Sequence, residues 1–269
     1  MVLIIAEKPS LARNIVAGID EKMDKKDGYF IGATYIVSWA FGHLFSLCDI
    51  ETYSPTKDGR WTLDNLPCFP EEFKFELRKA DDKKSVDKGV KKQFSILETL
   101  CNRSDVDTIV NAGDADREGE IIVRLCVANA LKGEKRQLRL WLPDQTPETV
   151  AKALCEMKEE REYDNLAGEG YARTYIDWLY GVNLTRFATI KTGKLLRVGR
   201  VIAPIVRAIY DRDMEIRNFK PEKYYVIQSS EETNGEKIDL TSKERFTKDE
   251  ENKANELARL YNEAGAVVT

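Results

Sequence analysis

Residues 113–120 read Gly-Asp-Ala-Asp-Arg-Glu-Gly-Glu, and this stretch decides the fold of the first half of the chain. It follows directly on an apolar run at residues 108–112, and a helical pattern begins immediately after it. The order predicts a buried strand, a loop and a helix. Asp114 and Asp116 then lie at the carboxyl end of the strand, where open α/β sheets build their sites.

The acidic residues of this loop are close enough in sequence to repel one another. A close pair of carboxylates repels by about 3–4 kcal/mol at an effective dielectric near 20. The side chains must therefore spread into water, take up protons or hold a cation. Carboxylate oxygens suit a hard divalent ion such as Mg²⁺. The alternative is a polar loop whose acidic residues simply favour a helix N-terminus.

A second acidic position favours a site over a simple polar loop. Residues 1–6 form an apolar run typical of a strand buried on both faces, and the run ends at Glu7. Pro9 then fits the first turn of a helix, where its missing N–H is not needed. If the two strands are neighbours in one parallel sheet, we expect Glu7 to meet the acidic loop at one rim.

Composition excludes several classes of protein. The chain has 269 residues and a formal charge of −4, so any binding of nucleic acid must rest on local patches. The five cysteines form no C-x-x-C pair and there is one histidine, which argues against a structural zinc site. Unpaired cysteines indicate a reducing cytosol. The apolar N-terminal run is too short to span a membrane and lacks the basic flank of a signal peptide.

Strand and helix patterns alternate up to about residue 145, which predicts an α/β domain with a parallel sheet. Within it we expect a solvated loop at residues 81–92, a helix at 93–100 and a strand at 138–142. Long amphipathic helices dominate residues 146–218. Strands return from residue 219, at 225–227 and 238–240, around an Asn-Gly turn. The last run, 265–269, reads as the start of a strand, which we interpret as a chain cut from a longer one.

With these residues in hand, the chain resembles the type IA DNA topoisomerases, specifically the bacterial topoisomerase III branch. The Toprim signature alone, at residues 114–120, also occurs in primases and some nucleases. Several further motifs follow the family's order, however, and the ordered set is specific. They are residues 6–13, the Gly-His-Leu at 42–44, the helix at 172–186, the segment 198–204 and the stretch 219–224.

The resemblance implies a Toprim domain at residues 1–145, part of a helical DNA-binding domain at 146–218 and the beginning of a β-rich, arch-forming region at 219–269. It implies an ATP-independent, Mg²⁺-dependent enzyme that breaks one DNA strand, holds it as a phosphotyrosine, passes another strand and reseals the gap. Its substrates would be single-stranded DNA and negatively supercoiled or catenated DNA. A cytoplasmic monomer is expected, with no membrane association and with room for a helicase partner.

Roles for individual residues follow from the same resemblance. Asp114, Asp116 and Glu118 would hold Mg²⁺. Glu7 would act near the leaving sugar oxygen, as an acid–base group or as a further metal ligand. Lys8 would pair with the scissile phosphate, and Arg117 would orient the acidic cluster. The alternative for Glu7 is an ordinary loop carboxylate, and the alternative for Lys8 is a solvated lysine. Glu120 is expected only to favour the helix start.

Two groups of charged residues are candidates for binding DNA. Arg173 and Asp177 are spaced i, i+4, and a plain intrahelical salt bridge is the alternative to a DNA role. A basic stretch follows, and it is either a solvated face or a groove for a single-stranded backbone. Its members are Arg186, Lys191, Lys194, Arg197 and Arg200. We expect His43 to be a partly buried, satisfied histidine, and Trp39, Trp141 and Trp178 to lie in the core.

The chain departs from the family pattern in two places. Ile202-Ala203 stands where the family has Gln-Thr, so a polar contact to DNA is either weaker here or supplied elsewhere. No tyrosine lies in the aromatic-Pro-Arg setting of the family's nucleophile. The covalent chemistry is therefore expected to belong to a segment beyond residue 269, and residues 1–269 alone are not expected to cleave DNA.

Two other interpretations remain open. One is another Toprim phosphoryl-transfer enzyme, either a primase or a nuclease of the overcoming-lysogenization-defect type. A primase would usually bring a zinc module, for which the cysteine pattern is absent. The second is a noncatalytic DNA-binding module in which the acidic rim is only structural. Such a module would bind DNA equally with and without Mg²⁺, and equally well after Asp116→Asn.

Overall fold

The computed structural model describes residues 1–55, 60–80 and 85–264. The chain divides into two compact units, Met1–Ala203 and Pro204–Thr269, and each is described here by itself. Within the described residues, no helix is both long enough and apolar enough to cross a membrane. The predicted domain boundaries after residues 145 and 218 stay predictions.

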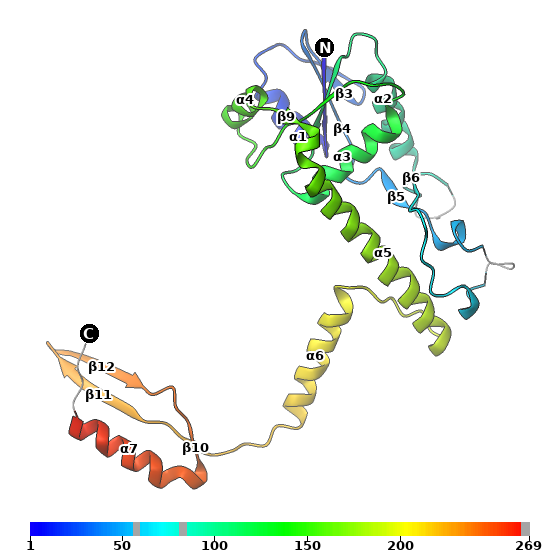
Figure 1. Ribbon diagram of the computed structural model, residues 1–269. Coiled ribbons are helices and arrows are strands. Elements are labelled where there is room, and N and C mark those ends of the chain that lie inside the picture. Colours follow the sequence, from blue (N-terminus) through cyan, green and yellow to red (C-terminus); the bar gives the residue numbers. More distant parts are fainter. Residues whose placement is uncertain (56–59, 81–84, 265–269) are drawn as a thin grey trace. The chain divides into compact units, whose positions relative to one another are not determined.

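The first unit is built on a seven-stranded sheet with the order β2-β3-β4-β1-β7-β8-β9 (Figure 1). Strands β4, β1, β7 and β8 are parallel to one another, and the strands at the two edges run antiparallel. This arrangement confirms the predicted α/β fold. The bounds are β1 (Val2–Ala6), β2 (Asp24–Lys26), β3 (Tyr29–Ile31), β4 (Tyr35–Trp39), β7 (Thr108–Ala112), β8 (Arg136–Arg139) and β9 (Lys158–Glu159).

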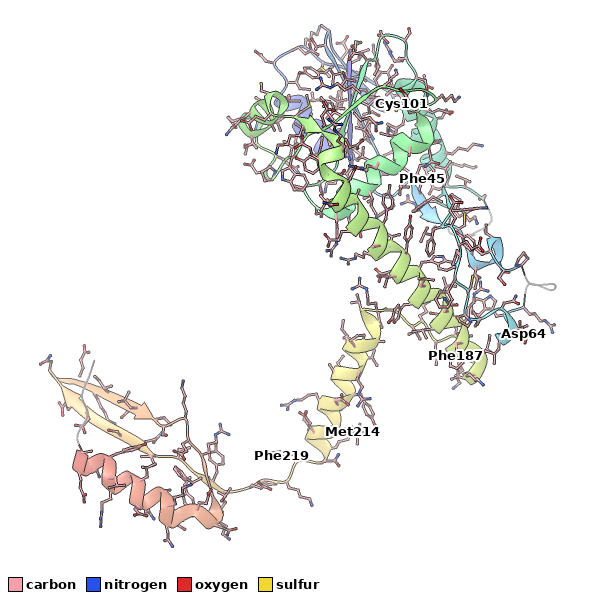
Figure 2. The ribbon with its side chains drawn as sticks, viewed as in Figure 1. Phe45, Asp64, Cys101, Phe187, Met214 and Phe219 are labelled. Carbon is pink, nitrogen blue, oxygen red and sulfur yellow. The ribbon has the colours of Figure 1, made fainter. Side chains whose placement is uncertain are left out.

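Helices cover both faces of this sheet, so the central strands are apolar on both sides. Leu3 and Ile5 of β1 pack in the cluster that includes α2 (Lys88–Cys101) and α3 (Arg117–Ala130). Ile4 and Ala6 point the other way, into the cluster with α1 (Pro9–Ala17) and α4 (Pro147–Cys155). Figure 2 labels Phe45 and Cys101, which are both buried in the first of these clusters.

Strands β1 and β7 are direct neighbours, which meets the condition under which Glu7 was expected to lie beside the acidic loop. Their register pairs Val2 with Thr108 and Ala6 with Ala112. Both strands therefore end at the same level, and the residues that follow them begin at one edge of the sheet. This pairing is the step that turns two acidic segments, separated by about a hundred positions in sequence, into neighbours in space.

The rest of the first unit packs against one long helix, α5 (Asp164–Thr192). Phe73 stacks on Tyr175 with ring centroids 4.2 Å apart, and Nε1 of Trp178 donates a hydrogen bond to the carbonyl of Cys48 at 3.0 Å. The segment between β4 and α2 contains β5 (Phe45–Leu47), β6 (Phe75–Leu77) and the short helices η1 (Ile50–Thr52) and η2 (Leu63–Asn65). A further short helix, η3 (Glu160–Tyr163), precedes α5. The three tryptophans expected in the core are only partly buried, and of these Trp39 packs at the margin of a hydrophobic cluster.

The second unit contains most of α6 (Ile202–Arg217), a hairpin and a final helix. The predicted Asn-Gly turn is confirmed, because Asn234 and Gly235 both have positive φ, at 54° and 80°. Phe246 is the buried anchor of this unit. The remaining elements are β10 (Tyr224–Tyr225), β11 (Gln228–Thr233), β12 (Glu236–Thr241), β13 (Phe246–Thr247), η4 (Lys248–Glu250) and α7 (Glu251–Ala264).

Several predicted element boundaries were wrong. The helix expected at 93–100 begins at Lys88, because the Asp87 side chain caps it by accepting from the N–H groups of Gly89 and Val90. The strand expected at 138–142 spans 136–139, and the strand expected at 225–227 is interrupted after Tyr225. Residues 81–84 of the expected loop, and the run 265–269, lie outside the described residues.

Candidate active site and metal centre

The acidic loop connects β7 to α3 through a turn that only glycine permits at two positions. A Cβ atom on Gly113 would lie 2.0 Å from the carbonyl oxygen of Gly119, and one on Gly119 would lie 2.4 Å from the nitrogen of Asp114. Asp116 caps α3, since its Oδ1 accepts the N–H of Gly119 at 2.7 Å. The same sequence that supplies the carboxylates therefore also closes the loop on itself.

Three of the predicted site residues are joined by direct contacts. The N–H of Asp114 donates to Oε2 of Glu7 at 3.2 Å, and Nζ of Lys8 lies 2.5 Å from Oδ2 of Asp114. Burial and the nearby Asp114 carboxylate raise the pKa of Glu7 above its ordinary value. The hydrogen bond to Asp114 raises the pKa of Lys8. The rim predicted from the two strand ends is thus present.

Glu118 faces a different partner, the loop that follows β4. Nε2 of His43 lies 3.2 Å from Oε2 of Glu118, and Nε of Arg173 lies 3.9 Å from Oε1. The backbone supports this placement, because the N–H of Gly42 donates to the carbonyl of Glu7 at 3.0 Å. His43 has a polar partner, as expected, but its side chain is 46% exposed beside the acidic rim and so is less buried than expected.

The acidic residues do not stand in a closed ligand cluster. In the part of the chain that the structure describes, no group of three His, Cys, Asp or Glu side chains is arranged to hold a metal ion. The donor set nevertheless fits Mg²⁺. Oδ1 of Asp114 is buried and finds no hydrogen-bond partner among the described residues, whereas Oδ2 of the same carboxylate contacts Lys8. A hard cation is the partner that such an oxygen accepts best.

Arg117 differs from its predicted role. Its guanidinium forms an ion pair with Glu169 of α5 rather than spanning the loop carboxylates. The helices are close here, because a Cβ on Gly170 would lie 2.6 Å from the carbonyl oxygen of Arg117. Helix α5 is thereby held against the first turn of α3, the turn that begins at Asp116.

The predicted pair of Arg173 and Asp177 is present, with Nε and Oδ2 3.8 Å apart, and Asp177 has a closer partner. Nε of Arg200 lies 2.6 Å from its Oδ1, and this guanidinium lowers the pKa of Asp177. Arg173 and Arg200 border a cavity of about 310 Å³ next to Arg117. The cavity is lined by Arg117, Glu169, Ala172, Arg173, Ile176 and Arg200.

The other members of the basic stretch separate into exposed and buried residues. Arg186 is buried, contacts Asp49 and Glu51 at 3.2 and 2.9 Å, and lies over the ring of Trp61 at 4.6 Å. It ties the segment before η2 to α5 and does not offer its guanidinium to the outside. The remaining three are exposed: Lys191, Lys194 and Arg197.

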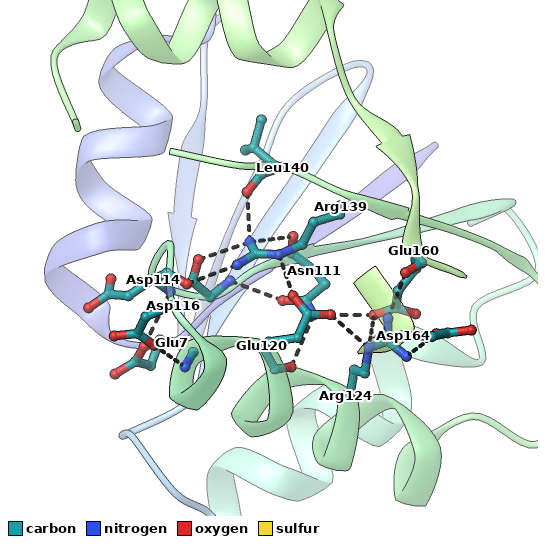
Figure 3. Close-up of polar contacts among 12 residues, drawn as sticks. Glu7, Asn111, Asp114, Asp116, Glu120, Arg124, Arg139, Leu140, Glu160 and Asp164 are labelled. Carbon is teal, nitrogen blue, oxygen red and sulfur yellow. Dashed lines mark hydrogen bonds and ion pairs between the residues drawn. The ribbon is translucent and has the colours of Figure 1, made fainter. Parts of the chain in front are cut away.

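A buried polar network lies behind the acidic loop, and sequence reasoning missed it (Figure 3). Arg139, the last residue of β8, has no exposed side-chain surface. Burial lowers the pKa of its guanidinium. It donates to Glu120 Oε2 at 2.6 Å and to the carbonyls of Asn111, Gly113, Asp114 and Leu140 at 3.2, 2.9, 2.8 and 2.8 Å.

Glu120 is the centre of this network and is fully buried, which corrects the expectation that it only favours the helix start. Nε of Arg124 lies 2.7 Å from its Oε1, and Arg124 continues to Asp164 at 2.7 Å and to Glu160 at 3.6 Å. Burial raises the pKa of Glu160. The available signal was an arginine in the middle of the apolar run 138–142, because a charge at such a position needs a buried partner.

Two protein families match successive parts of the chain. Residues 2–142 match the Toprim domain family, and residues 161–269 match the DNA topoisomerase family. A DNA topoisomerase 3 of Bacillus cereus is 39% identical over 228 residues, covering 84% of this chain and 30% of that protein. One of Haemophilus influenzae is 39% identical over 238 residues, covering 85% and 35%.

A third relative, the DNA topoisomerase 3 of Staphylococcus epidermidis, is 34% identical over 244 residues, covering 91% of this chain and 32% of that protein. The chain thus spans about a third of the length of these relatives. Its Toprim match extends over more than half of its residues, and the DNA topoisomerase match follows in the expected order. The chain belongs to the Toprim family and is a type IA, topoisomerase III-like chain.

Proposed function

We propose that residues 1–269 form the metal-binding and DNA-contacting part of a topoisomerase III-like enzyme. The enzyme makes a transient break in one DNA strand, passes another strand and reseals the gap. The attacking tyrosine is supplied by a segment outside residues 1–269. The observation that carries the proposal is the contact of Glu7 and Lys8 with Asp114, at the common edge of β1 and β7.

The residues suit transfer of a phosphodiester. Asp114, Asp116 and Glu118 would hold Mg²⁺, which when bound neutralises charge that develops on the phosphate oxygens. Lys8 binds a nonbridging oxygen of the scissile phosphate. Glu7 carries a proton more readily than an exposed glutamate, because burial raises its pKa. It can therefore hold a proton for the leaving sugar oxygen and take it back on resealing.

The arginines beside this edge would guide the single strand. Arg173 contacts Glu118 on one side and Asp177 on the other, so its guanidinium lies between the acidic rim and Arg200. The positive charge continues on three further exposed residues, Lys191, Lys194 and Arg197, which can contact the phosphates of a single strand. Exposed Ile202 stands where the family carries a polar side chain, so these basic residues supply more of the DNA contact here.

The remainder of the proposal follows from the likeness to bacterial DNA topoisomerase 3. Negatively supercoiled and catenated DNA are the substrates in the cell, and the enzyme works as a cytoplasmic monomer with room for a helicase partner. Magnesium is its cofactor. These properties do not depend on the details of the site, and they are tested on the parent-length protein, the longer protein that also carries the attacking tyrosine.

The decisive experiment uses that parent-length protein with an end-labelled single-stranded oligonucleotide and Mg²⁺, stopped with denaturant. Label attached covalently to protein, through a tyrosine beyond residue 269 mapped by mass spectrometry, supports the proposal. Cleavage without an adduct would instead indicate a Toprim nuclease. Binding without cleavage, unchanged by Mg²⁺ and by Asp116→Asn, would indicate a noncatalytic module.

A further inference from the structure

Asp114 is held from two sides. On the outer side its N–H and its carboxylate contact Glu7 and Lys8. On the inner side its carbonyl oxygen accepts a hydrogen bond from Nη2 of Arg139 at 2.8 Å, and the carbonyl of Gly113 accepts from Nη1 at 2.9 Å. One buried guanidinium therefore grips the backbone of the acidic loop at the residue that meets both strand-end side chains.

We propose that Arg139 is a positioning residue, which sets the direction of the Asp114 carboxylate by clamping the loop backbone from within. The proposal rests on the proposed function in one respect, namely that this carboxylate holds Mg²⁺. Arg139 acts through hydrogen-bond geometry, because two of its N–H groups donate to carbonyl oxygens of the acidic loop.

The positive charge of Arg139 is neutralised by a direct ion pair with Glu120. Nε contacts Oε2 of Glu120 at 2.6 Å, and both side chains have no exposed surface. The pair as a unit is neutral, so it adds little attraction or repulsion at the acidic rim. What it adds is a planar fork of N–H donors aimed at fixed carbonyls, since a guanidinium offers five such donors in one plane.

Lysine would keep the charge and lose the fork. An ammonium group can contact Glu120, but its compact shape cannot at the same time reach the carbonyls of Asn111, Gly113 and Asp114. Arg139→Lys thus separates geometry from charge. Arg124→Lys is the matched control, because Arg124 contacts the other oxygen of Glu120 at 2.7 Å and turns its remaining donors toward Glu160 and Asp164, away from the loop.

The experiment measures two properties of the 269-residue chain. Calorimetry with MgCl₂ gives the affinity for Mg²⁺, and NMR-detected hydrogen exchange gives the protection of the Asp114 N–H, with Ile4 in the centre of β1 as the reference for global opening. Arg139→Lys is expected to weaken Mg²⁺ binding by about 10- to 100-fold, as removal of a group that orients a ligand does. Exchange at Asp114 should accelerate by about 10-fold or more while Ile4 is unchanged.

Arg124→Lys is expected to leave both readouts within about 2-fold of the wild type, because none of the hydrogen bonds of Arg124 reaches a carbonyl of the acidic loop. If Arg139→Lys fails to fold, Arg139→Gln takes its place, because Glu120 then keeps Arg124 as a partner and a glutamine amide cannot reach all the loop carbonyls that the guanidinium binds. This variant should fold and show the same fast exchange at Asp114.

The outcomes separate the two proposals. Unchanged Mg²⁺ affinity and unchanged Asp114 exchange in Arg139→Lys would overturn the positioning role. Equal effects of Arg139→Lys and Arg124→Lys would also overturn it, because the shared partner Glu120 would then be the cause. A wild-type chain that binds no Mg²⁺, yet shows the exchange difference, would refute the metal part of the proposed function and leave the clamp standing.

Discussion

Nζ of Lys8 lies 2.5 Å from Oδ2 of Asp114, so an ammonium group rests on the carboxylate that we propose as a ligand of Mg²⁺. Mg²⁺ held by Oδ1 would share this carboxylate with the ammonium on Oδ2, and the two cations would repel each other. A phosphate of bound DNA, under the proposed function, would offer Lys8 an alternative partner. Substrate and metal are in this way expected to assist each other at the site.

Lys8→Met tests this competition. A unit charge about 6 Å from a divalent ion in water is worth about 1.4 kcal/mol, so removal of the ammonium should tighten Mg²⁺ binding to the free chain by about 10-fold. Binding of a single-stranded oligonucleotide should weaken in the same variant. Calorimetry with MgCl₂ and fluorescence anisotropy provide the two measurements. Weaker Mg²⁺ binding in Lys8→Met would contradict the competition.

Asp116→Asn tests the metal role without disturbing the fold. Asparagine caps a helix as well as aspartate does, so the free energy of unfolding should change by no more than about 0.5 kcal/mol. Removal of a unit charge about 4 Å from a divalent ion should lower Mg²⁺ affinity by about 30-fold. Asp144→Asn, outside the proposed site, is the control. Equal Mg²⁺ affinity in Asp116→Asn and the wild type would exclude Asp116 as a ligand.

Gly170→Ala tests the contact between α5 and the first turn of α3. The added Cβ would lie 2.6 Å from the carbonyl oxygen of Arg117, so the helices must separate, at a cost of about 1–3 kcal/mol. Gly168→Ala is the control in the same helix, because nothing lies within 4 Å of its Cβ. That control should gain up to about 1 kcal/mol from helix propensity. Urea unfolding that gives both variants the same sign of change would refute the close contact.

Glu160→Gln tests the buried network through pH. Burial raises the pKa of Glu160 in the folded chain above its ordinary value of 4.5, so its ionised form weakens folding at neutral pH. The glutamine variant, which keeps an oxygen for Asn111, should therefore melt at a higher temperature than the wild type at pH 7. Its advantage should shrink as pH falls through the raised pKa and vanish near pH 4.5.

Melting curves at a series of pH values decide the matter. Arg124 and Asn111 contact Glu160 at 3.6 and 3.2 Å, and both favour its ionised form. A glutamine variant that is less stable at pH 7, and that regains parity in acid, would mean that these contacts outweigh burial. The expected sign for Glu160 would then be reversed.

Lys194→Gln and Arg186→Gln should separate a DNA contact from a structural arginine. For single-stranded DNA, the slope of log affinity against log salt is negative, and each phosphate that a cation no longer neutralises reduces its magnitude by about 0.7; this is expected for exposed Lys194. Arg186→Gln should instead lower the free energy of unfolding by about 1–3 kcal/mol, because Arg186 is buried on Asp49 and Glu51. The reverse pattern would return Arg186 to the DNA-binding set.

The sequence indicated much of the sheet and of the acidic rim. Apolar runs followed by acidic residues predicted β1 and β7, and their direct pairing brings Glu7 to Asp114 as expected. It did not indicate the role of Arg186, because a basic stretch reads the same whether its members are buried or exposed. The start of α2 was also missed, since its cap at Asp87 lies in a run of charges that looks like a loop.

The sequence by itself determined the βα units, the tight glycine loop and the acid-bearing strand ends, because apolar periodicity and local steric limits are properties of neighbouring residues. Only the tertiary structure decided that Arg139 reaches back to the loop and that Glu120 is its buried partner, 19 positions away. It also decided that Lys8 rests on Asp114 and that His43 faces Glu118. These partnerships depend on strand order and on the packing of helices, which no local pattern encodes.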